Sequence, residues 1–153
     1  MRIHLISVAV ALLLPTGVSP AVAAGHSSAH GVSEVTPAKA LGKRDRKLRW
    51  AFRNHVSEIQ VTCKGVVVAK LPDDVFDIRH QRFLIELKSG QTLLIVHNID
   101  LVKRVKPLRV RDEVTVRGEY IWNEKGGLIH YTHRDPTGVH RTGWIKHRGK
   151  VYR

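Results

Sequence analysis

The stretch IQVTCKGVVVAKL, residues 59–71, decides the class of fold that this sequence encodes. Apolar Ile59, Val61 and Cys63 alternate with polar neighbours, which is the period of a strand that buries one face. Gly65 interrupts the alternation before a run of valines, and a glycine inside a long strand is typical of a bulge or a sharp bend. The pattern therefore predicts a long strand that curves in its middle.

Four more strands are predicted after this one. Residues 80–100 have the alternation of a hairpin that turns at a Ser-Gly pair. A fourth strand is predicted within residues 114–122, and the glycine-bearing turn 123–127 leads into a fifth at 128–133. About five curved strands fit a small closed barrel, so we expect an oligonucleotide/oligosaccharide-binding (OB) barrel. A β-sandwich is the alternative, because strand order cannot be read from one sequence.

The part of the chain before residue 57 divides into three segments. Residues 1–24 have a basic start, a short apolar run and small residues at the end, which is the order of a secretory signal peptide. The small, polar residues 25–36 predict a flexible lead-in. Residues 37–56 predict a basic helix, because apolar residues recur there at helical spacing among arginines and lysines. Residues 57–153 then form a single barrel domain.

Composition limits the cellular location and the partners that we expect. The signal peptide predicts a periplasmic or secreted protein, and no second apolar stretch follows that could form a membrane-spanning helix of about 20 residues. The single cysteine rules out an internal disulfide. A formal net charge of +13 favours polyanions such as nucleic acid, acidic glycans or anionic lipid headgroups. We therefore expect a monomer that binds nucleic acid or another polyanion.

Three histidines and an aspartate gather in HYTHRDPTGVH, residues 130–140. The DPTG sequence within it has the residue pattern of a type I turn. If the flanking residues pair around that turn, His133 faces His140, with Cβ atoms about 5 Å apart. Such imidazoles repel each other when both are protonated, which favours the neutral form that binds a metal or accepts a proton. His130 would point to the opposite face of an ideal strand, and joins the pair only if the strand twists or breaks.

Carboxylates in the predicted strands and turns are the candidate partners of these histidines. Imidazole and carboxylate without thiolate suit an open site for Zn²⁺, Mn²⁺ or Mg²⁺. A metal ion beside cationic side chains supplies an activated water and charge stabilisation, which phosphodiester hydrolysis requires. The predicted catalytic residues are His97, Asp100, Glu119, His130, His133 and His140. The predicted metal ligands are His97, Asp100, His133, Asp135 and His140.

Ordinary structural roles explain the same residues. Hydrogen-bonded histidines need no metal, and in the HNID sequence, residues 97–100, Asn98 and Asp100 are suited to capping the end of a strand. The aromatic residues Tyr120 and Trp122 are explained by core packing, which leaves Trp144 as the better candidate for an exposed ring that stacks on a base. The predicted nucleic-acid contacts are Arg82, Arg117, Arg134, Arg141 and Trp144.

Five motifs run in order through the predicted barrel. They are LPDD, HQRF, SGQTLLIVHNIDL, GEYIWNEKGG and IHYTHRDPTGVHRTGWIKHRGKVY. Together they resemble the domain-of-unknown-function family 3465, small exported bacterial proteins, over residues 57–153. The resemblance implies export and a compact β domain, and it implies no established activity. Tyr131 stands where a tryptophan is expected, and Arg134 replaces what is often another histidine, which counts against a ligand at that position.

Three functional hypotheses follow from these patterns. The first is an exported OB-like barrel that binds nucleic acid and cuts it as a divalent-metal-dependent nuclease or phosphodiesterase. The second is a non-catalytic periplasmic module that binds nucleic acid or another polyanion and whose histidines are structural. The third is a metal-binding envelope protein whose positive charge is incidental. Other enzyme classes receive no support, because no serine or cysteine nucleophile motif, Walker loop or dinucleotide fingerprint occurs in the sequence.

Overall fold

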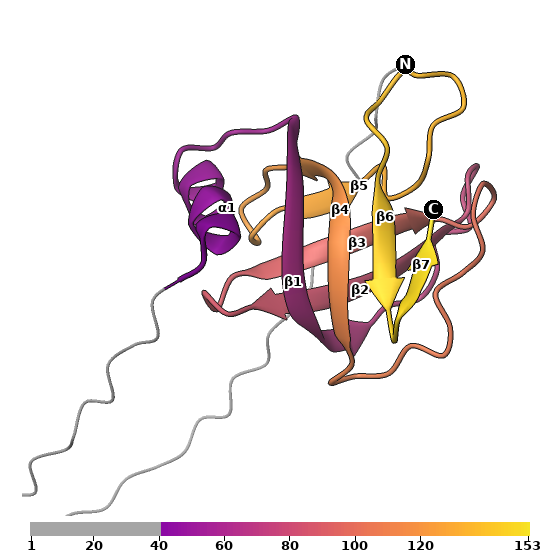
Figure 1. The fold of residues 1–153 in the computed structure, drawn as a ribbon, viewed down its shortest axis with the longest axis horizontal. Coiled ribbons are helices and arrows are strands. Elements are labelled where there is room, and N and C mark those ends of the chain that lie inside the picture. The colour runs from indigo at the N-terminus through magenta and orange to yellow at the C-terminus, as the bar shows by residue number, and fades with distance from the viewer. Residues whose placement is uncertain (1–40) are drawn as a thin grey trace, which may run out of the picture. The chain divides into compact units, whose positions relative to one another are not determined.

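The structure, a computed structural model, describes residues 41–153, and in them one helix precedes seven strands (Figure 1). The predicted signal peptide and lead-in, residues 1–36, lie outside the described residues. Within residues 41–153, no helix has the length and apolar character that crossing a bilayer requires. The elements are α1 (Lys43–Arg53), β1 (Ile59–Lys70), β2 (His80–Leu87), β3 (Thr92–Asn98), β4 (Glu113–Ile121), β5 (Leu128–His130), β6 (Trp144–His147) and β7 (Lys150–Tyr152).

The first five strands close into a barrel. Their order around the barrel is β1-β2-β3-β5-β4, and β4 returns to pair with β1, from Ile59 opposite Tyr120 to Val66 opposite Glu113. The β3–β5 pair is parallel and the other pairs are antiparallel. Closure confirms the predicted OB-like barrel and overturns the alternative, because a sandwich keeps two separate sheets. Strands β6 and β7 form a hairpin that pairs with β4 beyond the end of β5.

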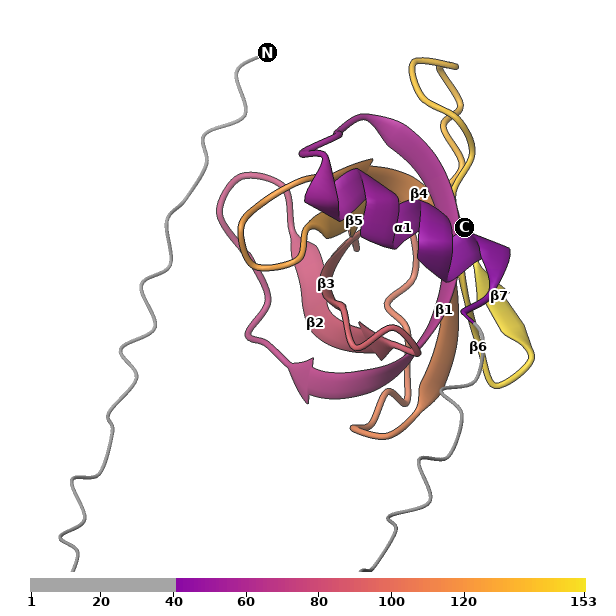
Figure 2. The same ribbon diagram turned by 90° about the vertical axis from the view of Figure 1, so that its left-hand side faces the viewer.

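Strand β1 closes the barrel by bending at the predicted glycine. Gly65 pairs with Val114 of β4 and with Leu87 of β2, so the strand changes partner at this point. A Cβ at position 65 would lie 2.8 Å from the carbonyl oxygen of Glu86, a distance that no side chain tolerates. A shift in register between Val67 and Ala69 adds the expected bulge. Figure 2 shows the resulting curvature of β1 around the barrel.

Each end of the barrel is covered by a different segment. Helix α1 lies across one end (Figure 2) and buries Leu48 and Ala51 completely. The helix begins at Lys43 and ends at Arg53, inside the predicted range 37–56, of which residues 37–40 lie outside the described part of the chain. At the other end, the connection between β3 and β4 inserts Val105, whose backbone N–H and C=O both bond the buried amide of Gln81 (2.9 and 3.0 Å).

Candidate functional site

The histidine-rich segment, residues 131–143, is a loop between β5 and β6 and not a paired hairpin (Figure 1). Strand β5 ends at His130, three residues earlier than predicted, because Tyr131 adopts a positive φ of 49°. The N–H of Gly143 donates to the carbonyl oxygen of His133 (2.8 Å), so the backbone pairing differs from the predicted register. His133 and His140 nevertheless meet, with ring centroids 4.8 Å apart and planes nearly perpendicular.

The break at Tyr131 also brings His130 to this loop. The Tyr131 ring lies between two imidazoles, with its centroid 4.0 Å from that of His130 and 4.1 Å from that of His140. The rings of His130, Tyr131 and His140 form a stack. The His133 ring packs edge-on against His140, at one end of that stack. We call these four residues the ring stack. Three of its members were predicted as site residues, and Tyr131 was not.

Asp135 determines the conformation of the loop. One of its carboxylate oxygens accepts hydrogen bonds from the hydroxyl and the backbone N–H of Thr137 (2.6 and 2.7 Å), and the other accepts from the backbone N–H of His140 (2.8 Å). These donors stabilise the charged form and hold the pKa of Asp135 well below its usual range. The second oxygen is 3.9 Å from His140 Nε2. Asp135 is thus an ionised turn residue that also touches the ring stack.

Backbone carbonyl groups set the tautomers of two histidines. Nδ1 of His133 bonds the carbonyl oxygen of Arg134 (2.9 Å), and Nδ1 of His140 bonds that of Arg141 (3.0 Å). A carbonyl oxygen only accepts, so each Nδ1 is assigned the proton, and each neutral ring keeps a lone pair on Nε2. These Nε2 atoms can accept a proton or bind a metal.

His130 has a carboxylate partner. Its Nε2 lies 3.2 Å from Oε1 of Glu119, the residue opposite it on β4. Burial lowers the pKa of His130, and the hydrogen bond and charge of Glu119 oppose that shift. The predicted residues Glu119 and His130 are therefore together at one edge of the ring stack.

His97 and Asp100 lie in different surroundings. His97 is completely buried, with Nδ1 2.8 Å from Thr132 Oγ1 and Nε2 3.4 Å from the carbonyl oxygen of Lys103. Burial lowers the pKa of His97 to about 4, so the ring is neutral and both nitrogens are engaged. The Asp100 carboxylate pairs with Arg79 (2.6 Å) and lies outside the ring stack. Asn98 caps the end of β3, as the structural alternative predicted.

A groove of about 420 Å³ runs beside the ring stack. It is lined by the start of β1, by Glu119 on β4 and by His140 and Arg141 on the loop. The side-chain amide nitrogen of Gln60 is buried at this groove and has no hydrogen-bond partner in the described part of the chain. Lys47 of α1 also lines the groove, and its ammonium group donates to the carbonyl oxygen of Gln60 (2.9 Å). The groove thus has one unused donor, the Gln60 amide nitrogen, beside cationic side chains.

The remaining predicted contacts are divided between this surface and other parts of the barrel. Arg117 on β4 is opposite Trp144 on β6, two residues along the same strand face from Glu119. Arg117 is exposed and Trp144 half-buried, so the outer face of β4 connects them to the groove. Arg134 is exposed on the loop. Arg82 lies on β2 and donates to the carbonyl oxygen of Pro72 (3.0 Å), outside the groove.

Metal coordination is not organised in the described part of the chain. No group of three or more histidine, cysteine, aspartate or glutamate side chains within residues 41–153 is arranged to hold an ion. The Nε2 atoms of His133 and His140 are suitable ligands, whereas both oxygens of Asp135 already accept hydrogen bonds from the loop. The donor set therefore fits a divalent ion only in part.

Several residues of the groove were missed by the sequence analysis, among them Gln60, Lys47 and Glu58. Gln60 was interpreted only as a polar position in an alternating strand, and Lys47 only as part of a basic helix face. The alternation does place Gln60 outward, which is the one signal that could have marked it. Lys47 reaches the groove through the packing of α1 against β1, for which residue spacing gives no signal.

Comparison with known proteins agrees with the sequence motifs. The profile of a family described as proteins of unknown function, DUF3465, matches residues 32–153. No curated protein matches the chain. The match covers most of the chain, includes α1 as well as the barrel, and confirms the resemblance predicted over residues 57–153. The chain therefore belongs to the DUF3465 family.

Proposed function

We propose that this protein is an exported nucleic-acid-binding protein that holds a single strand along the outer face of β4 and in the adjoining groove. Closed OB barrels bind oligonucleotides with cations and exposed rings on their outer strands. Here Arg117 and Trp144 lie side by side on that face, and Arg141 lines the groove. Among the described residues, neither arginine side chain has a carboxylate partner within 4.0 Å.

The observation that carries this proposal is the unpaired amide nitrogen of Gln60. A buried donor without an acceptor is costly, and a phosphate oxygen or a base carbonyl would satisfy it. Lys47 and Arg141 line the same groove and would hold the phosphate charge. Glu58 also lines the groove, and its negative charge opposes a phosphate there.

A fluorescence-anisotropy titration tests binding, with labelled single- and double-stranded DNA and RNA at several salt concentrations. Trp144→Ala is expected to weaken single-strand binding about fivefold or more, the usual effect of losing one stacked base. Arg117→Gln is expected to weaken it and to reduce the slope of log K against log salt by about one. Arg111→Gln, which changes an exposed arginine just before β4, is the charge-matched control for Arg117→Gln. Equal losses in these two arginine variants would show only general charge attraction and would refute the proposed surface.

Cleavage of the bound strand is the second candidate function. The observation that favours it is His140 beside Arg141 at the groove, because the proton assigned to His140 Nδ1 leaves Nε2 as a proton acceptor. A general base next to a cation can deprotonate a nucleophile while the cation stabilises the charge that develops on phosphate. A divalent ion such as Mg²⁺, Mn²⁺ or Zn²⁺ would be held by the Nε2 atoms of His133 and His140 and would activate water.

Incubation of the purified protein with the same oligonucleotides, with each of these ions or with EDTA, separates the hypotheses. EDTA-sensitive cleavage that is lost in His140→Ala supports a metal-dependent nuclease. Salt-sensitive binding without cleavage supports the non-catalytic module. Metal uptake without retention of any polyanion would refute both and leave the metal-binding envelope protein.

A further inference from the structure

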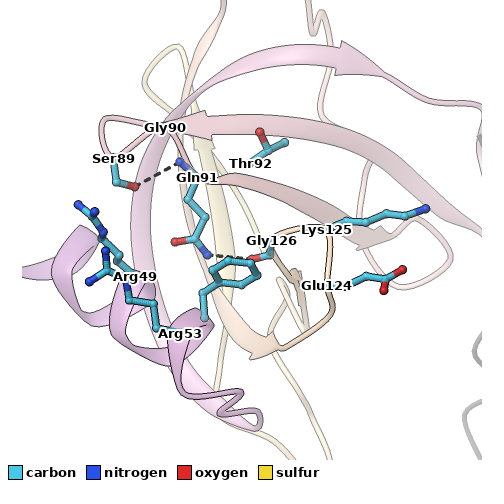
Figure 3. A pocket seen from close by; sticks show the side chains of 10 residues that line it. Arg49, Arg53, Ser89, Gly90, Gln91, Thr92, Glu124, Lys125 and Gly126 are labelled. Carbon is cyan, nitrogen blue, oxygen red and sulfur yellow. Dashed lines mark hydrogen bonds between the residues drawn. The ribbon is translucent and has the colours of Figure 1, made fainter. Parts of the chain in front are cut away.

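A second cavity, of about 470 Å³, lies between α1 and two turns of the barrel (Figure 3). The helix contributes Arg49, Phe52 and Arg53. The turn between β2 and β3 contributes residues 89–92, and the turn between β4 and β5 contributes residues 124–126. None of these residues belongs to the groove beside the ring stack, so this cavity is a separate feature of the molecule.

Two unpaired guanidinium groups give the cavity a positive edge. Arg49 and Arg53 are one helical turn apart, and both are exposed. Among residues 41–153, neither has a hydrogen bond or an ion pair from its side chain. Glu124 also lines the cavity, but Figure 3 shows its carboxylate on the side away from the two arginines. Paired arginines of this kind suit a phosphate group, whose oxygens match their N–H donors.

The cavity also contains a buried acceptor that no group within residues 41–153 satisfies. The amide nitrogen of Gln91 donates to the carbonyl oxygen of Gly126 (2.8 Å), which fixes the orientation of the side chain (Figure 3). The Oε1 atom of Gln91 is thereby turned away from that carbonyl group, and it is buried without a hydrogen-bond partner among these residues. A carbonyl oxygen in this position requires a donor, and a phosphate dianion has none to offer. The ligand must therefore carry a hydroxyl or an amine as well as a negative charge.

We propose that this cavity binds a phosphorylated sugar, with the phosphate on Arg49 and Arg53 and a sugar hydroxyl donating to Gln91 Oε1. The volume is in the range of small-molecule sites, and the half-buried Phe52 ring offers an apolar surface to the sugar carbons. This site is independent of the proposed nucleic-acid surface, because the two share no residue.

Calorimetric titration of the purified protein with ribose 5-phosphate, ribose and methyl phosphate tests the two halves of the site. Ribose 5-phosphate is expected to bind about tenfold more tightly than either of the other probes, because only it has both the phosphate and the hydroxyl groups. Equal binding of methyl phosphate would refute the contact with Gln91. Equal binding of ribose would refute the phosphate contact, and no binding of any probe at millimolar concentration would overturn the proposal.

Variants assign the binding to the named residues. Arg49→Gln with Arg53→Gln is expected to weaken ribose 5-phosphate binding about tenfold or more. Lys43→Gln with Arg44→Gln removes the same charge from the same helix, but outside the cavity. This control is expected to change the affinity for ribose 5-phosphate less than twofold. Gln91→Met is expected to reduce the preference for ribose 5-phosphate over methyl phosphate to near one. Equal weakening in both double variants would mean general charge attraction, which would overturn the site.

Oligonucleotide binding, measured on the same proteins, keeps the two proposals apart. The Arg49 and Arg53 double variant is expected to bind single strands as well as its charge-matched control does. Loss of oligonucleotide binding in the first variant alone would mean that the cavity holds a nucleic-acid backbone phosphate, and would refute an independent sugar-phosphate site.

Discussion

Replacing His97 with glutamine should remove part of the acid sensitivity of the fold. The ring is buried and its pKa is lowered from 6.5 to about 4, so the folded state excludes a proton that the unfolded chain binds. The folded state is therefore unaffected by this group above pH 6.5 and loses stability as the pH falls from there towards 4. Between pH 7 and pH 5 the loss from this one residue is about 2 kcal/mol, since each pKa unit corresponds to about 1.4 kcal/mol.

Urea denaturation at pH 7, 6 and 5 measures this effect for the wild type and for His97→Gln. The variant loses the hydrogen bond to Thr132, so its stability at pH 7 is lower, but the comparison depends only on the slope with pH. The wild type should lose about 2 kcal/mol more than the variant over this range. Carboxylates with strongly lowered pKa values, such as Asp112 with a pKa of about 2, titrate below this pH range. They therefore do not affect the comparison between the wild type and the variant. Parallel slopes would refute the assignment of His97 as a buried neutral ring.

Three further changes test the loop and the groove. Gly143→Ala would place a Cβ 1.9 Å from the carbonyl oxygen of Tyr131, and should lower the free energy of unfolding by about 3 kcal/mol in urea; an unchanged midpoint would contradict the packing. Asp135→Ala removes the acceptor of the His140 N–H, and should cost about 1–2 kcal/mol and weaken oligonucleotide binding in anisotropy, whereas unaltered binding would separate the loop from the site. Glu58→Gln removes an anion from the groove and should strengthen that binding by about twofold to fivefold; weaker binding would instead mean that Glu58 contacts a base.

The barrel could be predicted because its decisive features are local. Alternation in β1 and the glycine at position 65 belong to one short stretch, and the bend that they imply is the bend that lets β1 pair with both β2 and β4. The closing pair itself joins residues as distant as Ile59 and Tyr120, and one sequence carries no signal for that pairing. The curved strands that favour a barrel could therefore be predicted, whereas the strand pairing that closes the barrel could not.

The site was predictable only where the chain itself brings residues together. His133 and His140 meet because the Asp135 turn connects them over a few residues. His130 joins them because Tyr131 adopts a positive φ. This conformation is unusual for a residue of this size, and no pattern in the sequence predicts it. His97, which belongs to the same predicted set, is instead buried by barrel closure, so its role depends on contacts made far along the chain.

Helix α1 connects the two proposed sites, because its burial decides where its cations lie. Leu48 and Ala51 face the barrel and are completely buried. The cationic side chains next to them therefore lie along the two edges of this buried face. Lys47 then lines the groove beside the ring stack, whereas Arg49 and Arg53 line the second cavity. A barrel of the same strands without this helix would have neither set of cations at these positions. The basic helix, for which the sequence alone leaves phosphate contact and a solvated face equally open, is therefore the element that places cations at two separate edges of this barrel.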